Sequence, residues 1–247
     1  MRPFLNADPK TTLAYLLKAS VDKNVHIRRW SSEGSRPRLP WGERLNEFIK
    51  KPESTLPILE NLKYDDELYV RKSVANHLND IAKDHPDFVV KILKRWQQEV
   101  PTEHKPKIDW ITRHALRVLI KNGHAGALAL VGVSSNAAIE IKALKVSPTT
   151  LQFGESLRFS FEIQSTARKA QKLVIDYVIH FVKASGKTAP KVFKLKTFSL
   201  GPNEKLKIEK SHAVRKITTR DYFPGKHTLA LQINGKVVAQ KNWTLEI

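Results

Sequence analysis

Residues 26–41 read HIRRWSSEGSRPRLPW, and two later segments resemble its first seven residues, HIRRWSS. The recurrences are YVRKSVANHL at 69–78 and ITRHALRVLI at 111–120. Each copy carries an arginine, and the three arginines are separated by 43 and 42 residues. This period is typical of HEAT-type helical pairs, in which each repeat stacks on the next and the stack has a concave face.

The rest of residues 1–133 also has a helical period. Asp8-Pro9 and Lys51-Pro52 are typical helix starts, and Asn122-Gly123 is a typical helix stop. Apolar residues recur at three- and four-residue steps, as expected on the buried face of a helix. They include Leu13, Leu16 and Leu17; Val70, Val74, Leu78 and Ile81; and Leu116, Leu119 and Ile120.

From about residue 139 the apolar period changes to two. Short alternating segments such as LRFSFEI are separated by turn signals, and Asn234-Gly235 is a strong hairpin signal. About seven such segments are typical of an immunoglobulin-like β-sandwich. The sequence therefore predicts an α plus all-β chain of two domains. A HEAT-like α-solenoid at 1–133 is joined by residues 134–138 to an immunoglobulin-like β-sandwich at 139–247.

The charge of the chain indicates a polyanionic partner. The 247 residues include 43 Lys and Arg against 24 Asp and Glu, which gives a formal net charge of +19. Residues 134–247 contribute +12 of this excess and residues 1–133 contribute +7. Nucleic acid is the most common partner of such a chain.

The composition favours a cytoplasmic location. Cysteine is absent, which excludes disulfides, thiolate metal sites and cysteine nucleophiles, and fits a reducing compartment. No apolar run has the length of a membrane span, and the N-terminal sequence MRPFLNADPK has no apolar signal-peptide core. We therefore expect no membrane partner.

Motifs for metal or cofactor chemistry are missing. The nine histidines form no HExxH pattern, and neither a Walker loop, a GxGxxG loop nor a GxSxG elbow is present. We therefore expect neither a metal ion nor a cofactor.

Residues 26–41 concentrate side chains that a packed core does not need. Arginines bind phosphates through forked, charge-assisted hydrogen bonds, and tryptophans offer flat faces to a sugar or a cationic base. Glu33 is unfavourable on a DNA-facing surface unless it does chemistry or orients an arginine. The alternative is that Glu33 only pairs with a neighbouring arginine at a helix end.

A second acid, Asp80, lies in a helix expected between Glu67 and Asp84. Ser73, Asn76, His77 and Asp80 share a face of this helix that differs from its apolar stripe. Glu33 and Asp80 are about one repeat apart, so stacking brings them to neighbouring positions. Two alternatives stay open: Asp80 stabilises the contact with another repeat, and the repeated arginines pair with acids instead of facing phosphates.

The segments HIRRWSSEGSRPRLPW, VRKSVANHLNDIAKDHP and RHALRVLIKNGHAGALAL, followed by an immunoglobulin-like domain, closely resemble the AlkC-type DNA alkylation repair proteins. These are HEAT-like-repeat DNA glycosylases related to the AlkD type. The resemblance implies excision of cationic alkylated bases, 3-methyladenine in particular, from double-stranded DNA held on the concave helical surface and gripped by the sandwich. It also implies that further repeats and a further acid precede the position of Met1 in the family.

The resemblance and the residue chemistry together assign roles in this chain. Glu33 and Asp80 are the predicted catalytic carboxylates, which stabilise an oxocarbenium-like sugar and accept a proton from water. Trp30 and Trp41 are predicted to pack on the sugar or the cationic base. The residues predicted to hold phosphates are Arg28, Arg29, Arg36, Arg38, Arg71, Lys72 and Arg113.

Two other functions compete with the glycosylase prediction. A non-catalytic DNA-binding scaffold of HEAT-like repeats needs the same basic groove. A HEAT-type protein–protein adaptor predicts an acidic or apolar concave face, which fits the charge less well. We expect the protein to be monomeric in either DNA-binding case.

Overall fold

The structure of the protein, a computed structural model, describes residues 1–247 and contains two compact units. By their contacts the units divide between Ile120 and Lys121. The change from helix to strand lies later, between Leu130 and Ile139. The two predicted domain ranges, 1–133 and 139–247, therefore follow secondary structure, whereas packing groups the last helix with the strands.

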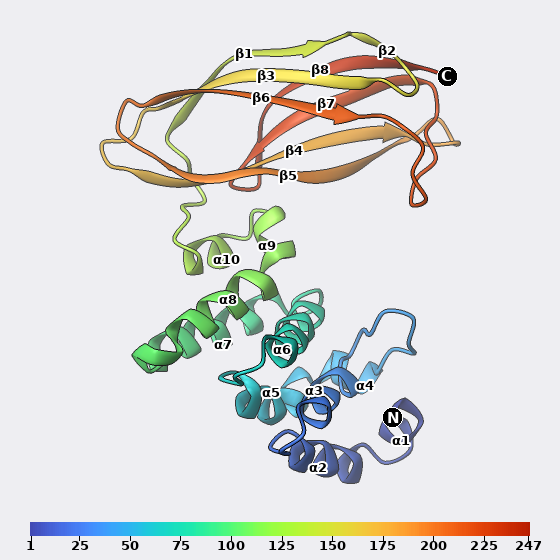
Figure 1. The fold of residues 1–247 in the computed structure, drawn as a ribbon, viewed down its shortest axis with the longest axis vertical. Helices are drawn as coiled ribbons and strands as arrows, with labels where there is room; N and C mark the ends of the chain where they lie inside the picture. Colours follow the sequence, from blue (N-terminus) through green and yellow to red (C-terminus); the bar gives the residue numbers. More distant parts are fainter. The chain divides into compact units, whose positions relative to one another are not determined.

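The first unit is helical (Figure 1). Its α-helices are α1 Arg2–Ala7, α2 Pro9–Ala19, α3 Val25–Gly34, α4 Asn46–Lys50, α5 Leu56–Leu62, α6 Leu68–Ile81, α7 Pro86–Glu99, α8 Lys105–Ala115 and α9 Arg117–Lys121, the last of which ends at the unit boundary. Two 3₁₀ turns, Pro52–Thr55 and Thr102–His104, precede α5 and α8.

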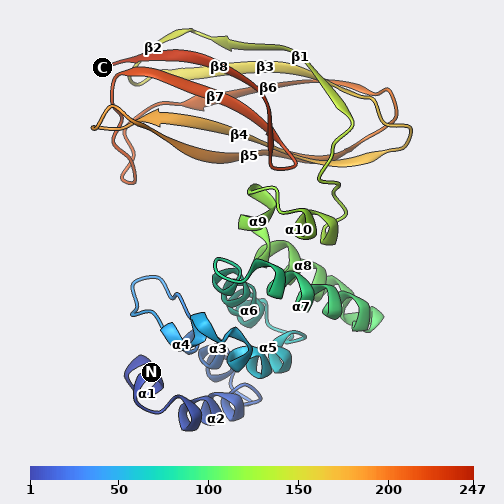
Figure 2. The same cartoon turned by 180° about the vertical axis from the view of Figure 1, so that it is seen from behind.

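Helices pair and stack in the first unit. α2 contacts α3, α5 contacts α6, and α7 contacts α8, while α3 packs on α6 and α6 packs on α8. Figure 2 shows this succession from behind. The second helices of the three pairs thus form one continuous row, which confirms the predicted HEAT-like arrangement.

The local signals that define the helices are confirmed in the structure. The side chain of Asp8 accepts a hydrogen bond from Thr11 N at 3.1 Å and caps α2, which begins at Pro9. Gly123 follows the end of α9 with φ of +73°. The predicted apolar stripe of α6 is buried throughout, from Val70 to Ile81.

The second unit is a sandwich of eight strands preceded by α10 (Ala125–Leu130). The strands are β1 Ile139–Ser147, β2 Thr150–Gln152, β3 Ser156–Ser165, β4 Gln171–Val182, β5 Thr188–Leu200, β6 Lys205–Ala213, β7 Gly225–Ile233 and β8 Lys236–Glu246. One sheet has the order β1-β3-β6, and the other has the order β2-β8-β7-β4-β5. This confirms an immunoglobulin-like sandwich after the helices.

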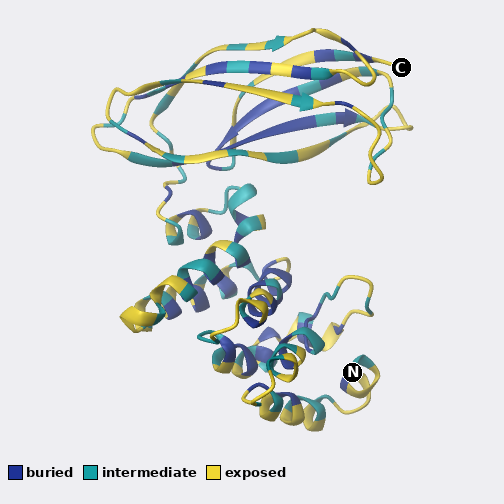
Figure 3. Ribbon diagram, viewed as in Figure 1, coloured by how far each residue is buried: buried dark blue, intermediate teal, exposed yellow.

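The sandwich core follows from alternation along its strands, visible as changing colours along β3 in Figure 3. In β3, Leu157, Phe159, Phe161 and Ile163 point into the core, and the residues between them are more exposed. Asn234 and Gly235 both have positive φ and join β7 to β8, which confirms the predicted hairpin. The extra strand is β2, whose three residues are too few to give a periodic signal.

Residues 121–134 pack within the second unit through backbone carbonyls. Gln232 donates to Lys121 O, Lys172 donates to Val131 O, and Asn234 donates to Ser134 O. These contacts explain why α10 belongs to the sandwich by packing. None of the helices in the chain combines the length and apolarity that crossing a bilayer requires.

Candidate functional site

Arg36 joins the two predicted carboxylates, Glu33 and Asp80. Its Nε and Nη2 each lie 2.7 Å from Asp80 Oδ2, and its Nη1 lies 2.7 Å from Glu33 Oε1. Glu33 lies next to the last residue of α3 and Asp80 next to the last residue of α6, so the stacking of these helices creates the cluster. The structure therefore brings the two acids together, as the repeat spacing predicts, with an arginine between them.

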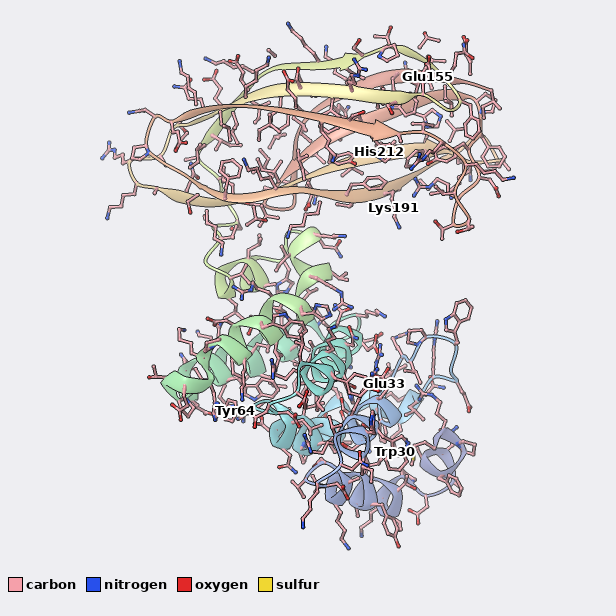
Figure 4. All side chains as sticks on the ribbon, viewed as in Figure 1. Trp30, Glu33, Tyr64, Glu155, Lys191 and His212 are labelled. Carbon is pink, nitrogen blue, oxygen red and sulfur yellow. The ribbon has the colours of Figure 1, made fainter.

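Glu33 is the accessible carboxylate of the pair and is labelled in Figure 4. Its side chain is 25% exposed, and its Oε2 accepts a hydrogen bond of 2.8 Å from the Ser73 hydroxyl. Burial opposes its ionisation, but the Ser73 hydroxyl and the positive charges of Arg36 and Arg29 outweigh burial and lower the pKa of Glu33. Glu33 is therefore ionised at neutral pH and is a weak base.

Asp80 is the enclosed carboxylate, with 4% of its side chain exposed. Arg36 occupies its Oδ2, and Lys83 Nζ lies 3.0 Å from its Oδ1. Both of its oxygens are thus engaged by cations of the chain. These ion pairs are compatible with a catalytic role of the two acids. They are equally compatible with the alternative, in which Glu33 and Asp80 only pair with arginines and stabilise the contact between repeats.

His77 and Ser73 complete the packing between α3 and α6. His77 Nδ1 lies 3.1 Å from Ser32 O, and Nε2 is buried without a partner. Burial, together with the charge of nearby Arg36, lowers the pKa of His77 to about 3. The ring is therefore neutral and donates from Nδ1 to the carbonyl.

An aromatic and cationic strip runs beside Glu33. The Arg29 guanidinium lies 4.1 Å from the ring centroid of Tyr69, and its Nη2 lies 3.5 Å from Glu33 Oε2. The His26 ring meets the edge of the same tyrosine at 5.7 Å between centroids. Tyr69 is partly exposed and was not among the predicted residues, because a lone tyrosine in an amphipathic helix carries no signal.

Trp41 occupies a strained turn after α3. Gly42 N donates to Leu39 O at 3.1 Å, which closes a β-turn with Pro40 and Trp41 at its centre. Trp41 has φ of +62°, a conformation that favours glycine or asparagine at this position of a type II turn. Its side chain is fully exposed. Trp30 is also exposed, though less completely, and lies on α3 (Figure 4).

Two of the repeated arginines have internal partners. Arg28 donates to the carbonyls of Asp22 and Lys23, and Arg71 donates to the carbonyls of Asp65 and Asp66, so each binds the loop five and six residues before it. These arginines are equivalent in the repeat and hold the turn between the paired helices. Arg28 also forms a salt bridge of 2.6 Å with Asp65.

The prediction that Arg113 is the third equivalent arginine is wrong. Arg113 is the ninth residue of α8, whereas Arg28 and Arg71 are each the fourth residue of their helices. Because α8 begins further before its arginine, Arg113 lies too far along the helix to reach the preceding loop. Arg113 is exposed and forms no ion pair. The same is true of Lys72 on α6.

The remaining predicted cation, Arg38, pairs with Asp84 through two hydrogen bonds of 2.7 Å. A further cation near Asp80, Arg117, had not been predicted. It donates to Asn76 Oδ1 at 3.1 Å, and burial lowers its pKa while Asp80 opposes that shift. Its only signal in the sequence is its position three residues after His114, in the repeat-like segment ITRHALRVLI.

No grouping of three or more His, Asp or Glu side chains in the structure could hold a metal ion. A pair of carboxylates, of which Asp80 is buried and Glu33 is partly exposed, can stabilise a positive charge that develops next to it.

Comparison with known proteins places these residues in a family. Residues 140–247 match the family described as "Uncharacterised protein YhaZ, C-terminal Ig-like domain". The uncharacterized protein YhaZ of Bacillus subtilis (strain 168) is 44% identical over 237 residues, which cover 96% of this chain and 64% of the relative.

A solved structure resembles the entire chain. Pseudomonas fluorescens alkylpurine DNA glycosylase AlkC, bound to DNA containing an abasic site analog, matches with a TM-score of 0.93 and 46% identity. The match covers 100% of this chain and 67% of that one, so the chain spans about two thirds of the length of these relatives. From the identity, the fold and the shared order of domains, we conclude that this chain belongs to the AlkC family.

Proposed function

We propose that the protein is a DNA glycosylase that removes cationic alkylated bases, of the 3-methyladenine class, from duplex DNA. The observation that carries the proposal is the Glu33–Arg36–Asp80 cluster, because it presents a carboxylate of lowered pKa among cations. Its presence in a chain 46% identical to an alkylpurine DNA glycosylase supports the same chemistry.

In the proposed reaction, the bond between the base nitrogen and C1′ of the deoxyribose breaks. The bonding electrons go to the base, which neutralises its positive charge, and a water oxygen bonds to C1′. The products are the free alkylated base, an abasic deoxyribose and one proton. A cationic base leaves without being protonated, so the chain needs no strong general acid.

Glu33 and Asp80 then share the task of stabilising the oxocarbenium-like sugar. The lowered pKa of Glu33 favours an electrostatic role over proton abstraction, because a weak base removes a proton poorly. Arg36 fixes the relative position of the two carboxylates. Trp41 offers an exposed indole face to the sugar or the cationic base.

The cations without internal partners supply phosphate contacts in this proposal. Lys72 and Arg113 are exposed and unpaired, and Arg29 has part of its guanidinium available beside Tyr69. Arg28, Arg36, Arg38 and Arg71 are committed to internal acids or carbonyls, and we propose that they organise the surface more than they bind DNA. A single contact to each phosphate orients the duplex without reading its sequence.

The sandwich contributes a second cationic surface. The lining of a cavity of about 520 Å³ includes three cations, Lys183, Lys191 and Arg220, and one acid, Asp221, and none of the cations forms an ion pair. The Arg220 guanidinium stacks 4.0 Å from the ring centroid of Phe181, which fixes its orientation. We propose that this surface binds DNA backbone and that the protein acts as a monomer in the bacterial cytoplasm.

Release of methylated base from methylated duplex DNA tests the proposal directly. The 247-residue chain should release the base in a time-dependent and enzyme-dependent manner and leave abasic sites in the duplex. The ion pairs of both acids favour one rival, a non-catalytic DNA-binding scaffold. That rival predicts tight binding of the same DNA without release.

A further inference from the structure

Asp80 has two cationic partners that differ sharply in exposure. Arg36 is 8% exposed and is held by Glu33 as well as by Asp80. Lys83 is 46% exposed and makes one side-chain contact, from its Nζ to Asp80 Oδ1 at 3.0 Å. The two oxygens of one carboxylate are thus served by different cations, one enclosed by protein and one in reach of solvent.

The two ion pairs also differ in how easily the cation can leave Asp80. The Arg36 guanidinium contacts one oxygen of Asp80 through a hydrogen bond from Nε and an ion-pair contact from Nη2 in a buried setting, and removing it would leave buried charge. The Lys83 ammonium is strongly hydrated, sits on a flexible stem and forms the kind of exposed pair that contributes little to stability. Lys83 can therefore leave Asp80 far more easily than Arg36 can.

We propose that Lys83 is a displaceable counter-ion of Asp80, an inference that rests on the proposed glycosylase function. When duplex DNA that carries a cationic lesion docks, the Lys83 ammonium moves from Asp80 Oδ1 to a DNA phosphate. The freed Oδ1 then faces the positively charged deoxyribose of the damaged nucleotide. Lys83 is a positioning residue, because it acts through Asp80 and does not contact the reacting atoms.

This exchange gives the site a preference for positive charge. A cationic nucleotide replaces the ammonium at Asp80 Oδ1, so the buried carboxylate keeps two positive partners throughout. An undamaged, neutral nucleotide offers no replacement, and Lys83 stays on the carboxylate. The same carboxylate is therefore masked in the free protein and available only opposite a charged lesion.

The test compares Lys83→Met, which keeps the length of the stem without its charge, with Lys83→Arg, which keeps the charge. Lys91→Met is the matched control, because Lys91 is an exposed lysine of α7 without an ion pair and the net charge changes equally. Asp80→Asn reports on the proposed function itself. Each protein is measured for its single-turnover release of methylated base and for the salt dependence of its affinity for methylated duplex, taken before the base is released.

With Lys83→Met, the slope of log affinity against log salt should become shallower by about 0.9, the contribution of one phosphate. Its single-turnover rate should be no slower than parental, because nothing remains to be displaced. Lys83→Arg should keep the slope and slow the chemical step by about threefold to tenfold, because a guanidinium binds a carboxylate by two strong hydrogen bonds. Lys91→Met should change neither the slope nor the rate.

Three results would overturn the inference. A Lys83→Met protein that slows tenfold or more with an unchanged salt slope shows that Lys83 stays on Asp80 during the reaction. A Lys83→Arg protein that reacts at the parental rate shows that no displacement occurs. Parental values for both variants show that Lys83 takes no part, and the proposed function then stands if Asp80→Asn is slow and fails if it is not.

Discussion

Arg36 contacts a single oxygen of Asp80 through both Nε, which donates a hydrogen bond of 2.7 Å, and Nη2, which lies 2.7 Å away in an ion pair. Asp80 is 44 positions further along the chain, on the neighbouring repeat. The same guanidinium reaches Glu33 with its third nitrogen. The arginine therefore serves as the common partner of both acids and sets the distance between them. The stability of this site and its proposed chemistry therefore involve the same three side chains.

Replacing Arg36 by alanine should destabilise the helical unit by roughly 3–5 kcal/mol, because two carboxylates lose a buried partner. Arg38→Ala is the matched control: its pair with Asp84 is much more exposed and should cost at most about 1 kcal/mol. Urea unfolding followed by the helical circular dichroism signal measures both. Equal losses for the two variants would show that the Arg36 cluster is not a buried network.

Trp41→Gly should separate stability from function. The variant relieves the positive φ of +62° and should therefore be as stable as the parent or more stable by about 1 kcal/mol. It also removes the exposed indole, so excision should fall by about tenfold, within the range of one lost stacking contact. Thermal unfolding and single-turnover excision decide this prediction. Loss of stability without loss of excision would assign Trp41 a packing role.

His77 should make the helical unit sensitive to mild acid. Its pKa is about 3 in the folded protein and about 6.5 in the unfolded chain. Only the unfolded chain takes up the proton between these two pH values. The free energy of unfolding therefore contains the full contribution of His77 above pH 6.5 and falls by about 1.4 kcal/mol per pH unit below it. His77→Asn keeps a donor for Ser32 O and removes the titration.

The stability difference between the parent and His77→Asn should therefore be constant above pH 7.5 and should shift in favour of the variant as the pH falls from 6.5 to 4.5. Urea unfolding at a series of pH values measures this difference. A difference that does not change with pH would mean that His77 is accessible to protonation in the folded state.

A chain that ends at residue 136 should keep its helices and bind DNA more weakly than the complete chain. The removed part carries the larger share of the excess positive charge, and the cavity with Lys183, Lys191 and Arg220 lies in it. Circular dichroism checks the helices, and titration with duplex DNA measures the affinity. Equal affinities of the two chains would show that the sandwich does not contribute to DNA binding.

The sequence predicts the fold well because its signals are local. The apolar periods of the helices and strands, the cap at Asp8 and the Asn234-Gly235 turn each depend on neighbouring residues, and the repeat interval adds the stacking. The division of the chain between Ile120 and Lys121 could not be predicted, because it depends on distant partners of backbone carbonyls such as Gln232.

The sequence predicts which residues form the site but not which of them form ion pairs with one another. Stacking of repeats brings Glu33 near Asp80, as the interval predicts, yet the sequence does not show which arginine lies between them. Arg113 illustrates the limit: a similar motif places it in a different turn of its helix, so its side chain has different neighbours. The positive φ of Trp41 is equally invisible, because no local preference of tryptophan favours it.

The most direct test of the central claim is single-turnover release of 3-methyladenine from methylated duplex DNA by the parental chain, Glu33→Gln and Asp80→Asn. We predict that the parent releases the base and that each variant, per folded molecule, is slower by about tenfold to a thousandfold, as expected for one lost electrostatic contribution. DNA affinity should be equal or tighter in the variants, because a negative charge is removed. Release by both variants at the parental rate, or tight DNA binding by the parent without any release, would contradict the proposed catalytic roles and favour the non-catalytic scaffold.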